Sequence, residues 1–165
     1  MTFRPKSKSK KEKLMALAFA ISAVLLFLIS AVSRFAGVLQ IIAVIFAVVS
    51  IEVYMKYVGS DYIYDAADDY FKVYRVTGNK SVCVSSLDYE MSLSKVISNK
   101  EYLDNKSEYP KVSYTVNLAK NIFPKEYHVY FFEFDGKKVM MKFEPDEVFV
   151  KYINEIIVNN AVNVE

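Results

Sequence analysis

The chain has few of the residues on which enzyme and metal chemistry depends. Among its 165 residues there is one cysteine, Cys83, one histidine, His128, and no tryptophan. A single cysteine excludes a disulfide within the chain and a cysteine-rich metal site, and a lone thiol is typical of a reducing compartment. One histidine makes a zinc site equally unexpected, and no glycine-rich phosphate loop is present. The sequence therefore predicts no catalytic set, no metal site and no cofactor.

One enzymatic alternative stays open on residue type alone. Cys83 and His128 could form a nucleophilic pair if their segments were neighbouring strands of one sheet. The acidic group Asp65, Asp68 and Asp69 lacks the ligand spacing and the glycine of a calcium loop, so we expect a solvated turn there. The main expectation is a non-enzymatic protein.

Charge is scarce in the first third of the chain. Between Leu14 and Ile51 the only charged residue is Arg34. Residues 14–32 form an uncharged run that, as a helix, is about 28 Å long, close to the roughly 30 Å hydrocarbon core of a bilayer. A second apolar run covers residues 36–58, after a short link that contains Gly37. So short a link predicts an antiparallel hairpin of two transmembrane helices.

The distribution of basic residues predicts the orientation of this hairpin. Residues 1–13 form a basic tail in which Glu12 is the only acid, whereas the link between the helices carries Arg34 alone. Because basic segments stay on the cytoplasmic side, we expect a two-span protein of the cell membrane with both termini in the cytoplasm. The tail should also be attracted to anionic lipid at the membrane surface. The lysines expected to contribute are Lys6, Lys8, Lys10, Lys11 and Lys13.

A cleaved signal peptide is the alternative to the first helix. The start is basic, and Ala31-Val32-Ser33 has small residues at the cleavage spacing. Cleavage would leave one span and could send the rest of the chain outside. Against this, the first apolar run is longer than a usual signal-peptide core and a second one follows at once, so we favour the uncleaved hairpin.

Residues 59–158 have the pattern of a soluble domain rich in β-structure. Two hairpins are predicted, residues 70–87 around Gly78-Asn79 and residues 126–143 around Asp135-Gly136, because these pairs favour tight turns between strands. Further strands are expected at residues 61–64 and 112–118, and residues 99–108 are expected to be an exposed loop. The residues from 59 onward are net acidic, which disfavours nucleic-acid binding.

The last element expected is an amphipathic helix. Glu144-Pro145-Asp146-Glu147 is a helix start, because proline and acids favour the first turn. An apolar stripe follows to about Asn159, and residues 159–165 remain as a tail. The stripe consists of Val148, Phe149, Tyr152, Ile153, Ile156 and Ile157. The predicted fold class is therefore α+β: a transmembrane helical hairpin, then an antiparallel β-sheet or barrel capped by a C-terminal helix.

The late hairpin EYHVYFFEFDGKKVMMKF and the helix start FEPDEVFVKYINEII resemble a known family. They are similar to the PH-like (pleckstrin-homology-like) domains that are attached to one or two membrane helices in low-GC Gram-positive bacteria. The resemblance covers residues 60–158 and implies a binding scaffold. In lipid-binding PH domains the first loop is basic, whereas the first loop here, residues 65–69, is acidic, so phosphoinositide binding is not expected.

Together these features predict a membrane-anchored, non-enzymatic scaffold whose PH-like domain lies at the cytoplasmic face. Its partners would be the lipid bilayer and either another protein or a second copy of the chain. Tyr102, Leu103 and Tyr109 are the candidate partner surface, since they lie in a predicted exposed loop. The alternative is an accessory subunit of a transporter or channel, in which the alanine-rich first helix and Gln40 make the functional contacts.

Overall fold

The computed structural model describes the secondary structure of residues 1–6 and 10–162. The chain divides into two compact units. The helical unit is Ser7–Ser60, and the β-rich unit combines Met1–Lys6 with Asp61–Glu165. The helical unit is thus inserted between two parts of the β-rich unit.

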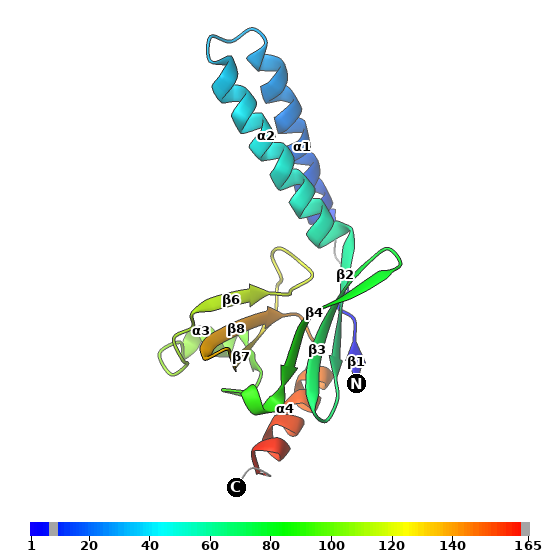
Figure 1. Ribbon diagram of the computed structural model, residues 1–165, viewed down its shortest axis with the longest axis vertical. Coiled ribbons are helices and arrows are strands. Elements are labelled where there is room, and N and C mark those ends of the chain that lie inside the picture. The colour runs from blue at the N-terminus through cyan, green and yellow to red at the C-terminus, as the bar shows by residue number, and fades with distance from the viewer. Residues whose placement is uncertain (7–9, 163–165) are drawn as a thin grey trace. The chain divides into compact units, whose positions relative to one another are not determined.

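The helical unit is an antiparallel pair of helices (Figure 1). Helix α1 is Lys10–Ser30 and α2 is Ala36–Val53, which continues as one π-helical turn, η1, over Tyr54–Val58. Small residues lie buried where the helices meet: Ala16, Ala23 and Ala43. The Ser50 hydroxyl donates to the Ala16 carbonyl at 2.8 Å. The two predicted helices are therefore confirmed as helices, with the first beginning at Lys10 instead of Leu14.

The outer surface of the helical unit is apolar. By length and composition both helices could cross a membrane. Side chains that a soluble helix would bury stay largely exposed in this unit. They include Leu17, Ile21, Leu25, Phe27, Leu28, Ile41, Val44, Ile45 and Val48. Such a surface is compatible with a lipid environment.

In the described residues, the β-rich unit forms two four-stranded sheets and no closed barrel. The first sheet has the order β1 (Thr2–Phe3), β2 (Ser60–Ala66), β3 (Tyr70–Thr77) and β4 (Lys80–Asp88). The second has the order β5 (Ile97–Ser98), β7 (His128–Phe134), β8 (Lys137–Phe143) and β6 (Tyr114–Asn117). A 3₁₀ turn, η2, covers Tyr89–Met91.

Both predicted hairpins are present. Strands β3 and β4 turn at Gly78, whose φ is +58°, and β7 and β8 turn at Asp135 and Gly136, with φ of +49° and +68°. Positive φ at both central residues is the type I′ geometry that an Asp-Gly pair favours. The local turn residues were therefore sufficient to predict these two pairings.

Two expectations about the strands and loops are wrong. Strand β6 pairs with β8 in parallel, so the second sheet is mixed and not wholly antiparallel. The predicted loop at residues 99–108 begins with a short helix, α3, over Asn99–Asp104. The Ser98 hydroxyl caps this helix by accepting from the Glu101 amide at 3.1 Å.

Strand β1 was not expected, because the sequence analysis assigned it to the basic tail. Thr2 and Phe3 pair antiparallel with Asp65 and Tyr64 of β2. The Phe3 ring also packs against Phe149, with 5.8 Å between the ring centroids. A two-residue strand has no alternation that a sequence pattern could reveal.

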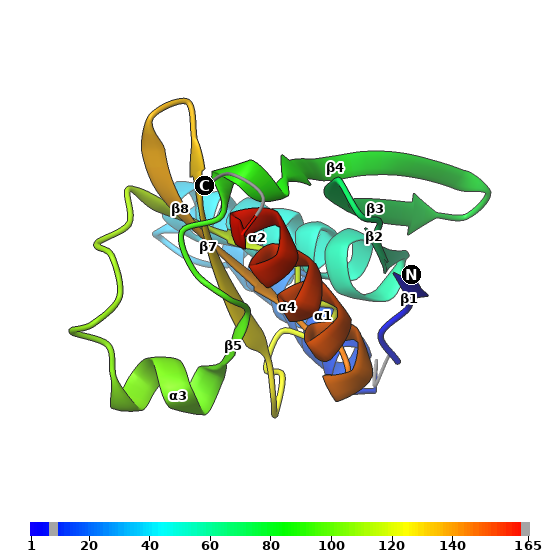
Figure 2. The same cartoon turned by 90° about the horizontal axis from the view of Figure 1, so that it is seen from below.

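Helix α4, Glu147–Val162, completes the core by packing against both sheets (Figure 2). The Asp146 carboxylate caps it by accepting from the Phe149 amide at 2.8 Å. Its buried stripe contains Phe149, Ile153, Ile156 and Ile157. Val148, which the sequence placed in this stripe, is 65% exposed, and the helix continues beyond the predicted end at Asn159.

Candidate functional site

The lysines predicted to meet the membrane surface are exposed where they are described. Lys6 belongs to the β-rich unit, whereas Lys10, Lys11 and Lys13 lie in the first turn of α1. Lys8 lies outside the described residues. The four described lysines are therefore exposed on the surface of the chain.

The predicted partner surface is only partly exposed. The Tyr102 and Tyr109 rings pack on Phe131 of β7, at centroid distances of 5.7 and 5.4 Å. They pack against a small buried cluster that also contains Ile97, Val129 and Met140 of the second sheet. The Leu103 side chain does not belong to this cluster and is 61% exposed. Two of the three residues thus stabilise the fold, and Leu103 alone offers a large free apolar surface.

Cys83 and His128 lie on different sheets. Cys83 is exposed on β4, and its thiol donates to the Ser85 carbonyl at 3.3 Å. His128 begins β7, where burial lowers the pKa of its imidazole and no described residue hydrogen-bonds to its Nδ1. The required pairing on neighbouring strands of one sheet is therefore not found. Among the described residues there is also no group of three His, Cys, Asp or Glu side chains that could hold a metal ion.

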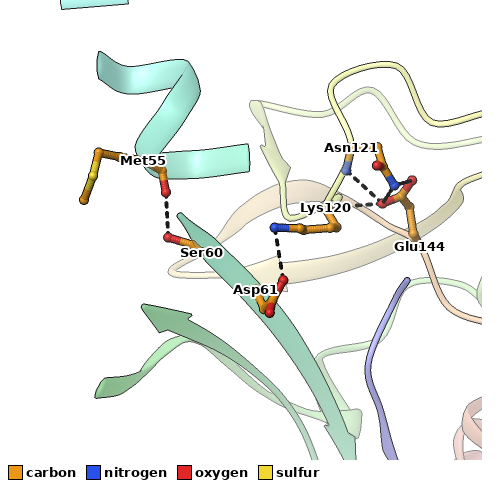
Figure 3. Close-up of polar contacts among 6 residues, drawn as sticks. All are labelled: Met55, Ser60, Asp61, Lys120, Asn121 and Glu144. Carbon is orange, nitrogen blue, oxygen red and sulfur yellow. Dashed lines mark hydrogen bonds and ion pairs between the residues drawn. The ribbon is translucent and has the colours of Figure 1, made fainter. Parts of the chain in front are cut away.

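The most organised polar cluster is one that the sequence analysis missed (Figure 3). The Lys120 side chain is 1% exposed, and its ammonium pairs with the half-exposed Asp61 carboxylate at 3.1 Å. The Glu144 carboxylate accepts from the backbone amides of Lys120 and Asn121 at 2.8 and 3.0 Å. The Asn121 side-chain amide donates to both Glu144 oxygens at 3.0 Å. These bonds fix the start of the segment 119–126, which we call the 119–126 loop.

Tyr64 joins this cluster to the core. It is fully buried, and its hydroxyl donates to the Leu118 carbonyl at 3.0 Å while accepting from the Glu144 amide at 3.2 Å. Burial raises the pKa of the Tyr64 phenol well above its usual range, so the proton needed for donation is retained. The cluster thus connects β2, the end of β6, the 119–126 loop and the end of β8.

This cluster lies at the end of the β-rich unit where β2 begins. The chain enters β2 from η1 through Gly59 and Ser60, and the Ser60 hydroxyl donates to the Met55 carbonyl at 2.6 Å (Figure 3). Asp61, the partner of Lys120, is the first residue of the β-rich unit after that connection. No local pattern distinguishes Lys120 from the exposed lysines of other loops, because its acidic partner Asp61 lies far away along the chain.

Two surface depressions are open and lack the enclosed shape of a small-molecule site. One, of about 590 Å³, is lined mainly by residues of α4 such as Lys151, Asn154 and Glu155. The other, of about 470 Å³, lies beside the turn at Asp135-Gly136. Small-molecule sites usually enclose the ligand and direct a few polar groups at it. Neither depression does this.

Comparisons with protein-family models, with curated proteins and with solved structures find no match to this chain.

Proposed function

We propose that this chain is a membrane-anchored, non-enzymatic binding module that presents its β-rich unit at the cytoplasmic face of the cell membrane. The observation that carries the proposal is the place of the apolar helical unit, inserted between the paired strands β1 and β2. A protein built this way acts on what reaches the membrane surface.

The strand pairing supports a hairpin that returns to its side of origin. Thr2 and Phe3 pair with Asp65 and Tyr64, so the chain on either side of the helical unit belongs to one folded domain. A folded sheet cannot be divided by a bilayer, because its backbone groups would lose their partners in lipid. Two crossings satisfy this condition, whereas one crossing does not.

The basic residues support the cytoplasmic side. Lys6, Lys10, Lys11 and Lys13 are exposed around the start of α1, and the opposite end of the hairpin carries Arg34 alone. Segments rich in lysine are retained in the cytoplasm during insertion. Anionic lipids at that surface would add to the attraction.

Binding of another protein is supported by two features of the β-rich unit. Strand β4 is an edge of its sheet, and the side of an edge strand that faces away from the sheet can pair with an added strand. Leu103 adds an exposed apolar side chain on α3. A PH-like fold remains our proposal for this unit, supported by its antiparallel hairpins and its C-terminal helix.

The side of the membrane is tested with Cys83, the only cysteine, which is exposed on β4. A membrane-impermeant maleimide should label it in lysed cells but not in intact cells. The control is Cys83→Ser with Val32→Cys, because Val32 is 90% exposed beside the link between the helices. That thiol should react in intact cells. Labelling of Cys83 in intact cells, or release of the chain by alkaline carbonate, would overturn the proposal.

A second candidate function is an accessory subunit of a membrane complex, favoured by Gln40. Its amide is exposed on the outer surface of α2, where a polar group in lipid gains by bonding to another helix. A photo-crosslinking residue at position 40 and one at position 103 distinguish the two functions. Adducts at position 103 alone support the binding module, and adducts at position 40 alone support the accessory subunit.

A further inference from the structure

The 119–126 loop exposes an aromatic side chain that its own domain does not use. Phe123 is 75% exposed, more than any other large apolar side chain that the structure describes in the β-rich unit. Single exposed apolar residues are common on protein surfaces. Phe123 differs from such residues in its position and in the hydrogen bonds that hold the start of its loop.

The loop is held firmly where it leaves the sheet. The Glu144 carboxylate binds the amides of Lys120 and Asn121, and the Lys120 ammonium is buried against Asp61 (Figure 3). On the other side of the ring, Pro124 fixes its own φ and keeps Phe123 out of the helical region. The aromatic ring is thus presented by a supported loop.

The covalent structure ties Asp61, the ion-pair partner of Lys120, to the end of the second apolar helix. Asp61 follows Val58, the last residue of η1, by three residues, and three residues span at most about 11 Å. This limit holds for every orientation of the two units. The headgroup layer of a bilayer is about 5–8 Å thick on each side. Asp61 is therefore held near that layer if the second apolar helix spans the bilayer, and the Lys120 ammonium lies 3.1 Å from the Asp61 carboxylate.

The chemistry of the loop tip matches the membrane interface. Aromatic rings concentrate at the headgroup level, where an apolar ring and a polar surrounding coexist. Lys125 is exposed next to Pro124 and can face anionic headgroups, whereas the neighbouring Glu126 offsets part of that charge. The ring should therefore contribute more than the charge does.

We propose that the 119–126 loop is a second membrane contact, in which the Phe123 ring enters the headgroup region of the bilayer that holds the helical unit. The inference rests on the proposed membrane anchoring and adds a lipid-binding residue to it. Its consequence is restricted rotation of the β-rich unit about the short connection at Gly59, so that one face of the domain is presented to the cytoplasm.

The absence of tryptophan from the sequence makes a direct test available. The variant Phe123→Trp places a single indole at the loop tip. The matched control is Val158→Trp, at a position that is 38% exposed on α4. The neighbouring Asn160 side chain donates to the Asp68 carbonyl at 3.1 Å, in the turn that follows β2. Position 158 therefore lies at the end of β2 opposite to Asp61.

Both full-length variants are reconstituted into vesicles of equal parts phosphatidylcholine and phosphatidylglycerol, with and without brominated acyl chains. We expect brominated lipid to quench the indole at position 123 at least twofold and the indole at position 158 hardly at all. If quenching of the indole at position 123 persists in vesicles of phosphatidylcholine alone, the aromatic ring makes the contact and the charge of Lys125 is not needed for it. Equal quenching at the two positions, or none at either, overturns the loop contact.

Carbonate extraction of the same vesicles separates this inference from the proposed function. If both indoles escape quenching while the chain resists extraction, the loop contact is wrong and the anchor stands. If the chain is extracted, the anchor fails and the loop contact fails with it.

Discussion

The hydroxyl of Tyr64 is the single group whose removal should most clearly loosen the 119–126 loop from the core. In Tyr64→Phe the ring remains between Phe143 and Phe149, with which it now makes edge and tilted contacts at 5.3 and 6.3 Å. The substitution therefore changes hydrogen bonding and leaves the apolar packing in place. It removes the hydrogen bonds that the hydroxyl makes to the Leu118 carbonyl and the Glu144 amide.

The magnitude follows from those two stranded groups. A buried polar group without a partner costs about 1–3 kcal/mol, so we expect the free energy of unfolding to fall by about 2–4 kcal/mol after partial relaxation. For a domain near this size, each kcal/mol lowers the midpoint by roughly 4 °C, which corresponds to a decrease of about 8–16 °C. Solvent cannot readily replace the two lost hydrogen bonds, because the Tyr64 ring is fully buried.

The measurement is thermal unfolding of the full chain in detergent micelles, followed by circular dichroism in the β-sheet region. We expect the helical unit to keep its helices in micelles, so that the transition reports the β-rich unit. Tyr114→Phe is the matched control, since Tyr114 is 43% exposed on β6 and its hydroxyl makes no hydrogen bond in the described part of the structure. If Tyr64→Phe unfolds at the same temperature as Tyr114→Phe, the hydroxyl does not hold the loop and the reasoning is refuted.

Three further predictions concern other parts of the molecule. Lys120→Met should lower the free energy of unfolding, measured by denaturant titration, by only about 1–2 kcal/mol, because its partner Asp61 is half exposed and can be hydrated. The control Lys151→Met, at an exposed ion pair, should change nothing measurable in the same titration. His128 should destabilise the domain as the pH falls through and below the usual histidine pKa of 6.5, since burial lowers the pKa in the folded state while the unfolded state binds a proton. His128→Gln should remove this part of the pH dependence of unfolding, and identical pH profiles for the variant and the unmodified chain would contradict the prediction. Ala23→Leu should lower the fraction of dodecyl sulfate in mixed micelles at which α1 separates from α2, because Ala23 is 8% exposed at the helix contact. The control Val24→Leu, at a 59% exposed position, should leave that fraction unchanged.

The parts of the fold that sequence reasoning predicted are those with a local cause. The two helices follow from uncharged apolar runs, and both hairpins follow from turn residues such as Asp135-Gly136. Helix α4 follows from its acidic start and its 3.6-residue period. Each of these signals is contained within about twenty residues, so no knowledge of distant contacts was needed.

The parts that were missed depend on contacts between distant residues. Strand β1 exists only because Thr2 and Phe3 meet β2 about sixty residues later. The burial of Lys120 depends on Asp61, and the support of the 119–126 loop depends on Glu144. A lysine in a loop is usually exposed, so nothing local distinguished this one. The sequence therefore does not predict the candidate site, nor the exposure of Phe123 in its loop.

The pairing of β1 with β2 also connects assembly of the helical unit with completion of the sheet. Closing a flexible loop of about sixty residues costs roughly 3–4 kcal/mol, as (3/2)RT ln n. A two-residue strand with one packed ring, Phe3, contributes little more than that. Packed helices, however, have axes only about 8–10 Å apart, so the pairing of α1 with α2 brings the two ends of the loop together and lowers the entropy that β1 loses on docking. We therefore expect the pairing of β1 with β2 to depend on the packed helices, which the bilayer would hold together in the proposed membrane form.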